Sequence, residues 1–138
     1  YANMLAVCKG GEGSAPNLQH CDTFKGDKPL RFNPANASVN LEGRLRYSGS
    51  GEILSDDAQL SSDLNNVLNL NVARLKQNRH AVFLGVKREL STLKKHATKA
   101  DISRLIDKWK VFNKEDKRKP YFAAAVYFLN KRLGKCSS

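Results

Sequence analysis

The chain has 138 residues, of which 41% are hydrophobic, and a formal net charge of +11. This length and composition suit one domain of ordinary size with a real core, and they argue against a disordered chain. The longest apolar run, from Tyr121 to Leu129, is too short to cross a bilayer, and no signal peptide is recognisable, which argues against a membrane protein.

The first 55 residues are predicted to form a small β-containing head. Residues 1–8 are predicted to form a short strand, a glycine-rich loop follows, and residues 19–25 suit a short helix that stops at Gly26. Between Val39 and Leu54, apolar residues alternate on either side of a Gly-Ser-Gly turn, which predicts a β-hairpin.

The remainder is predicted to form about four amphipathic helices. We expect Ser55 to cap the first helix and an apolar stripe to run along a longer second helix. Thr98 and Asp101 are predicted to form a capping box at the third helix, and Pro120 to occupy the first turn of the last. The sequence therefore predicts an α+β, mainly α fold, in which a bundle of about four helices follows the head.

The positive charge is concentrated in the second half of the chain. Residues 1–35 have a net charge of +1 and residues 36–71 of −3, whereas residues 72–138 combine eighteen lysines and arginines with five acids, a net charge of +13. Such an excess makes nucleic acid the first partner to consider. Solvated, lysine-rich helix faces are the alternative, and charge alone does not decide between the two.

The three cysteines are too few and too scattered for a disulfide framework, which favours a reducing cytoplasm. For Cys8 and Cys21, metal ligation is then the better interpretation, whereas Cys136 is predicted to be a free thiol. The chain opens at Tyr1, without Met and inside an apolar stretch, so we expect further residues upstream.

The chemistry is concentrated in residues 1–34. Two cysteines cannot complete the four ligands of a structural zinc site, but Cys8 is predicted to end a strand and Cys21 to open a helix, where a zinc ion would tie both to an upstream segment that supplies two more. Asp22 adds a hard oxygen ligand suited to Mg²⁺ or Mn²⁺. Lys25 follows one helical turn later and can meet a phosphate. A buried cysteine pair with a helix-capping aspartate is an equally good interpretation of these residues without a metal.

The pattern Asn-Met-Leu-Ala-Val-Cys at residues 3–8, followed by Cys-Asp-x-x-Lys-Gly-Asp-Lys at residues 21–28, resembles the second half of an HNH endonuclease motif. In that family two strands and one helix hold a single divalent metal. The pattern is most similar to HNH nucleases of bacterial anti-phage defence, such as the nuclease subunit of Septu systems and the HNH effectors of some retrons. The resemblance implies a C-terminal HNH half at residues 1–35, a hairpin at 36–55 and a basic helical region at 56–138.

The resemblance also implies roles for single residues. Asn3 matches the middle member of the HNH triad, which orients the catalytic histidine, and Asp22 matches the last member, a ligand of the catalytic Mg²⁺ or Mn²⁺. Cys8 and Cys21 match half of a structural zinc site. The general-base histidine and the other cysteine pair precede Tyr1 in the family's pattern, so we expect these 138 residues alone to be inactive.

This sequence departs from the family's pattern at two points. A long glycine-rich loop separates Cys8 from Cys21, and Asp22 replaces the commoner His or Asn. No histidine of the chain is expected to replace the upstream one, because His20 adjoins Cys21, and because His80 and His96 lie in the helical half, where solvated positions are expected.

The resemblance implies hydrolysis of phosphodiester bonds in nucleic acid, with DNA as the first candidate substrate. It also implies a cytoplasmic location and an ABC/SMC-like ATPase as partner. Lys25, Lys28 and the run of Lys117, Arg118 and Lys119 are expected to contact backbone phosphates. A second interpretation is a basic helical adaptor for nucleic acid or protein with a non-catalytic HNH remnant. A third is a zinc-dependent transcription regulator, against which no helix pair has helix-turn-helix spacing.

Overall fold

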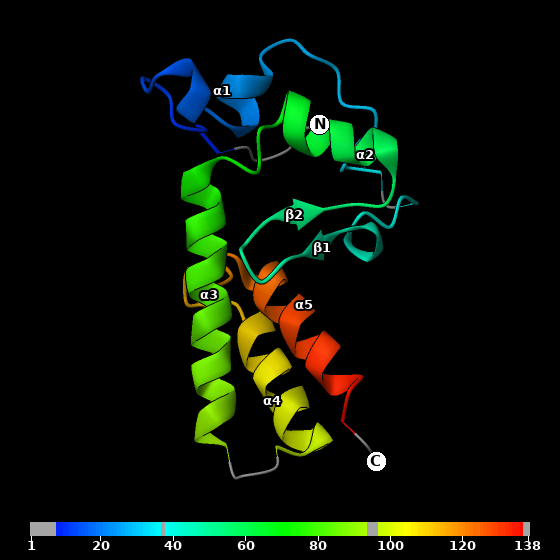
Figure 1. The fold of residues 1–138 in the computed structure, drawn as a ribbon, viewed down its shortest axis with the longest axis vertical. Helices are drawn as coiled ribbons and strands as arrows, with labels where there is room; N and C mark the ends of the chain where they lie inside the picture. Colours follow the sequence, from blue (N-terminus) through cyan, green and yellow to red (C-terminus); the bar gives the residue numbers. More distant parts are fainter. Residues whose placement is uncertain (1–7, 37, 94–96, 137–138) are drawn as a thin grey trace. The chain divides into compact units, whose positions relative to one another are not determined.

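The computed structural model describes residues 8–36, 38–93 and 97–136 (Figure 1). The fold is mainly helical with one two-stranded antiparallel sheet, which confirms the predicted α+β, mainly α class. The chain divides into two compact units, the first made of residues up to Ser48 with Glu52–Lys76, the second of Gly49–Gly51 with Gln77–Ser138. None of the described helices has the length and apolarity needed to span a membrane.

The first unit contains little regular structure. Its elements are the short helix α1 (Cys21–Lys25), the paired strands β1 (Arg46–Tyr47) and β2 (Ile53–Leu54), and helix α2 (Ala58–Ser62), which continues into a π turn over Asp63–Val67. Single 3₁₀ turns lie at Pro16–Leu18 and Glu42–Arg44. The buried core is formed by Ile53, Leu60 and Leu64, with five partly buried apolar residues packed against it. So small a core contributes little apolar burial for the length of chain it must hold.

Two details of this unit differ from the sequence prediction. The hairpin is shorter than expected, because the Asn40 side chain accepts a hydrogen bond from the Gly43 backbone (2.9 Å) and turns the chain before β1 can begin. The N-cap of α2 is Asp57 and not Ser55. The Asp57 carboxylate accepts from the backbone of Gln59 and Leu60, and its negative charge complements the helix dipole, which a serine hydroxyl does not.

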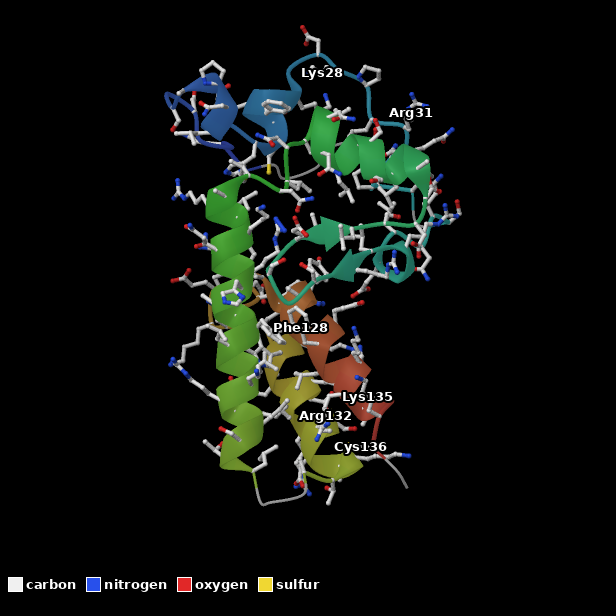
Figure 2. All side chains as sticks on the ribbon, in the orientation of Figure 1. Lys28, Arg31, Phe128, Arg132, Lys135 and Cys136 are labelled. Carbon is white, nitrogen blue, oxygen red and sulfur yellow. The ribbon has the colours of Figure 1, made fainter. Side chains whose placement is uncertain are left out.

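The second unit is a packed group of three helices, α3 (Ala73–Thr92), α4 (Lys99–Lys110) and α5 (Phe122–Leu133). The first turn of α3 belongs to the first unit, and the helix enters the second at Gln77. All three contribute to one core, whose fully buried members are Val86, Ile102, Ala125 and Leu129. Phe128 of α5 extends this packing toward α3, where its ring centroid lies 4.4 Å from that of Phe83 (Figure 2). The long apolar stripes of the sequence are therefore core.

The ends of these helices follow local chemistry. Thr98 and Asp101 form both hydrogen bonds of the expected capping box at the start of α4. Pro120 does not lie in the first turn of α5 as expected. The N-cap of α5 is Tyr121, which has a φ of +57°, so the proline precedes the helix. The Asn78 side chain donates to the Tyr121 hydroxyl (2.9 Å) and holds that residue in place.

His80 is more than the solvated surface residue expected from its position on a helix. Its Nδ1 lies 2.7 Å from the Gly49 carbonyl oxygen in the turn that joins the two strands. The guanidinium of the buried Arg79 donates to the Gly51 carbonyl of the same turn (2.6 Å). Both side chains therefore have a structural role.

Candidate metal centre

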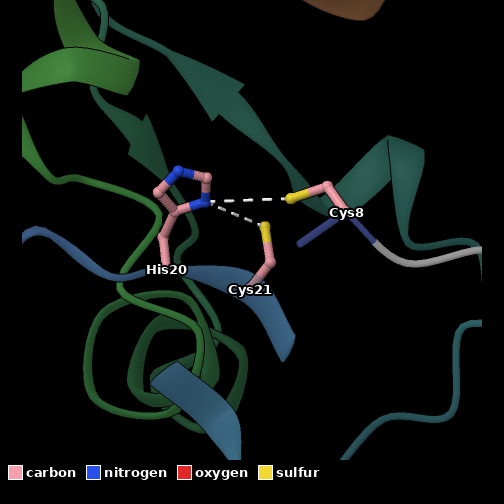
Figure 3. A group of neighbouring side chains, drawn as sticks. All are labelled: Cys8, His20 and Cys21. Carbon is pink, nitrogen blue, oxygen red and sulfur yellow. Dashed lines mark hydrogen bonds between the residues drawn. The ribbon is translucent and has the colours of Figure 1, made fainter. Parts of the chain in front are cut away.

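Three metal-binding side chains converge where the loop from Cys8 meets the start of α1 (Figure 3). The Nδ1 atom of His20 lies 3.8 Å from the Cys8 Sγ and 3.3 Å from the Cys21 Sγ. All three donor atoms lie within 4.8 Å of one another, and they form the one such cluster of three found among the described residues. The structure thus brings together the two predicted cysteines and adds a histidine.

The two distances from Nδ1 to the sulfurs are close to those between ligands that share a zinc ion. A tetrahedral zinc with Zn–S bonds of about 2.3 Å and Zn–N bonds of about 2.0 Å separates its ligand atoms by roughly 3.5 to 3.8 Å. Two thiols and an imidazole are soft or borderline donors, which favour zinc over magnesium. The three side chains therefore fit zinc, and one further ligand would complete a closed site.

The glycine-rich loop positions His20 by a close approach of two backbones. Gly10 accepts a hydrogen bond from the His20 N–H (2.8 Å), and it is itself buried with a φ of +58°. A Cβ atom on Gly10 would lie 1.7 Å from the His20 carbonyl oxygen. Only glycine fits at this position of the loop.

Cys21 is held by residues far along the chain. Its φ of +52° is costly for a residue with a side chain, by about 1 kcal/mol or more. The Leu68 carbonyl accepts from the Cys21 N–H (2.8 Å), and the Asn69 side chain donates to the Gln19 carbonyl (2.7 Å). The end of the π turn therefore fixes the backbone from which His20 and Cys21 project.

The surroundings favour the uncharged forms of both inner ligands. Burial, with a smaller contribution from the positive charge of Arg74, lowers the pKa of His20, so its imidazole is neutral and free to bind a metal. Burial also raises the pKa of the Cys21 thiol to about 12, assisted by Cys8 and Asp22. Without a metal this thiol keeps its proton, and a zinc ion would displace it.

These shifts predict how the stability of the metal-free protein depends on pH. Below about pH 6.5 the unfolded chain takes up a proton on His20 that the folded chain resists, so stability falls with falling pH. From pH 9 toward 12 the unfolded chain releases the Cys21 proton that the folded chain retains, so stability falls again. Thermal melts in EDTA should show a maximum between these limits. His20→Gln should flatten the fall in melting temperature at low pH, and Cys21→Ser the fall at high pH. If both variants melt with the pH profile of the parent, His20 and Cys21 do not cause it.

The structure also places the other predicted site residues. Asp22 is exposed in the first turn of α1, next to Cys21. The Lys25 ammonium donates to the Gly26 carbonyl (3.0 Å), and that of Lys28 lies 4.7 Å from the centre of the Phe24 ring. Asn3 lies outside the described residues. Within the described part of the chain, Asp22 joins no group of three or more metal-binding side chains.

The basic run lies far along the chain, in the segment between α4 and α5. Arg118 packs against two phenylalanine rings, Lys119 lies over the Trp109 ring, and Lys117 pairs with Glu115 (2.9 Å). All three residues of the run are exposed. Their cations are held at the surface by neighbouring side chains.

Sequence reasoning missed His20 as a candidate ligand. His20 was considered only as a replacement for the upstream general-base histidine and was set aside because it adjoins Cys21. Here His20 is extended (φ −151°) and Cys21 has a positive φ, and this pair of conformations turns both side chains toward Cys8. The available signal was the glycine-rich loop, which predicts close backbone approach at this point.

Comparison of the chain with protein families, curated proteins and solved structures finds no match.

Proposed function

We propose that this chain is part of a metal-dependent HNH endonuclease that hydrolyses phosphodiester bonds of nucleic acid, with DNA as the first candidate substrate. The observation that carries the proposal is the convergence of Cys8, His20 and Cys21 at the start of α1, with Asp22 exposed beside them. In the family that residues 1–34 resemble, a catalytic aspartate, asparagine or histidine directly follows a cysteine ligand of the structural zinc.

The zinc cluster would serve the fold rather than the reaction. Cys8, His20 and Cys21 leave one position of a tetrahedron for a further ligand, so only one of the two upstream cysteines that the resemblance implies would be needed. A zinc ion held in this way would join an upstream segment to α1. It would thereby hold Asp22, the residue after Cys21, in a fixed orientation.

Asp22 would supply one carboxylate ligand to Mg²⁺ or Mn²⁺, with the remaining ligands and the general-base histidine coming from the segment that the resemblance implies upstream. The bound cation would polarise the scissile phosphate and stabilise negative charge on the leaving oxygen. Lys25 and Lys28 lie on and just after α1, where their ammonium groups can exchange local contacts for the backbone phosphates of a substrate. Asn3 would orient the histidine.

The proposal extends to the cellular setting that the resemblance implies: cytoplasmic anti-phage defence, with an ABC/SMC-like ATPase as partner. The competing interpretation is a basic adaptor that binds nucleic acid or protein without cutting. It is supported by the second unit, which has its own core and most of the positive charge.

A cleavage assay separates these two functions. The gene product that contains these residues is incubated with plasmid DNA, and with RNA of matched length, in EDTA, Mg²⁺ or Mn²⁺. We expect cleavage only with the added cation, and about one zinc per chain in the purified protein before EDTA is added. Binding without cleavage in every condition would favour the adaptor and contradict the nuclease.

A further inference from the structure

The segment between α4 and α5, residues 111–121, is short, exposed and internally braced. The Asn113 N–H donates to the Lys117 carbonyl (2.8 Å), and the Asn113 side chain accepts from the backbone of Glu115 and Lys117 (2.9 Å each). These bonds close a tight turn over residues 113–117. The residues on either side of the turn, Phe112 and Arg118, are therefore brought together.

Two cations of this segment pack against aromatic rings in the segment and beside it. The Arg118 guanidinium lies 4.6 Å from the centre of the Phe112 ring and 4.5 Å from that of Phe122, so it is held between the two. The Lys119 ammonium lies 4.8 Å from the Trp109 ring. Such contacts are worth about 0.5 to 2 kcal/mol each and hold the charges in a defined place at the surface.

Phe112 stands out because it remains 51% exposed despite its contact with Arg118. A phenylalanine ring with one face against a cation and half of its surface in water has a face available to a ligand. The charge around it is strongly positive, since residues 110–119 contain five lysines or arginines against two acids. A protein partner would be expected to meet a larger apolar patch than Phe112 with its neighbour Val111.

We propose that this segment, which we term the Phe112 platform (Phe112, Lys117, Arg118 and Lys119), binds single-stranded nucleic acid by stacking one base on Phe112. The base would pack on the exposed part of the Phe112 ring, beside Arg118, and Lys117 and Lys119 would contact the phosphates on either side. Duplex DNA keeps its bases stacked on one another, so the platform favours a single strand. The inference does not rest on the metal centre or on cleavage, and it holds or fails separately from the nuclease proposal.

The test measures binding of a labelled oligo(dT) single strand, and of a duplex of equal length, by fluorescence anisotropy in EDTA. Phe112→Ala removes the ring on which one base would stack and should weaken single-strand binding by about 5- to 150-fold. Phe112→Leu keeps the apolar volume without the ring and should weaken it similarly, whereas Phe112→Trp should bind within about threefold of the parent. Val111→Ala is the matched control, because it removes an exposed apolar side chain next door and should leave affinity unchanged.

Two further measurements make the result decisive. Lys117→Gln with Lys119→Gln should lower the salt dependence of single-strand binding, because fewer counterions are released, whereas Lys131→Gln with Lys135→Gln on the C-terminal side of the unit should have a smaller effect. Trp109 is the single tryptophan of the chain, so its emission reports whether each variant keeps the fold around the platform. Full affinity in Phe112→Leu, or equal losses for single strand and duplex, would overturn the proposal and leave the patch to a protein partner.

Discussion

Asp22→Ala is expected to abolish Mg²⁺- or Mn²⁺-dependent cleavage in the gene product that carries this chain while leaving its melting temperature unchanged. The Asp22 side chain is exposed and contributes no apolar burial, so its removal takes away a proposed metal ligand and nothing that the core needs. The measurement pairs a cleavage assay with a thermal melt. Retained cation-dependent cleavage would contradict the role of Asp22.

Three companion variants test whether the effect is specific to a metal ligand at position 22. Asp27→Ala removes another exposed carboxylate five residues later in the same segment, so it controls for the change in local charge and should cut at the parent rate. Asp22→His and Asp22→Asn restore the residue types commoner in the family that this segment resembles, and should recover part of the activity. If Asp27→Ala loses as much activity as Asp22→Ala, the effect is electrostatic and no specific ligand is identified.

The helical half of the fold was largely predictable because its signals are local. The apolar stripe of α3 places Val82, Val86 and Leu90 in the core, and the capping box at the start of α4 is formed; each depends on residues a few positions apart. The shorter hairpin and the cap at Asp57 were not predicted, because in each case an Asn or Asp side chain competes for backbone hydrogen bonds that the apolar pattern does not reveal.

The candidate site was predictable in its chemistry and not in its geometry. The residue types of Cys8, Cys21 and Asp22 indicated metal binding, but no spacing rule indicated that His20 would face the two thiols. That orientation depends on the positive φ of Cys21 and on a hydrogen bond to Leu68, forty-seven positions away. The cation–aromatic stack at Arg118 is likewise invisible in the sequence, because the turn braced by Asn113 creates it.

Removing zinc is expected to lower the melting temperature of the first unit sharply and to leave that of the second unchanged. The core cluster of the first unit has three buried apolar residues, and its elements are few and short, so we expect a zinc ion held by Cys8, His20 and Cys21 to fix its loops. In small zinc-folded domains the metal supplies on the order of 10 kcal/mol, far more than a marginal core. The second unit has its own core, made by α3, α4 and α5, and none of the three ligands.

Hydrogen exchange and fluorescence follow the two units separately. On addition of a chelator, peptides from residues 8–76 should lose protection, including the Cys21 amide that donates to Leu68, while peptides from α4 and α5 stay protected and Trp109 emission is unchanged. His20→Ala should reproduce the chelated state and lower the zinc content. Cys136→Ser, which removes the cysteine outside the cluster, should leave hydrogen-exchange protection and zinc content unchanged. If residues 8–76 remain protected in protein shown to be free of zinc, the cluster does not hold the first unit together, and the small core must suffice without a metal.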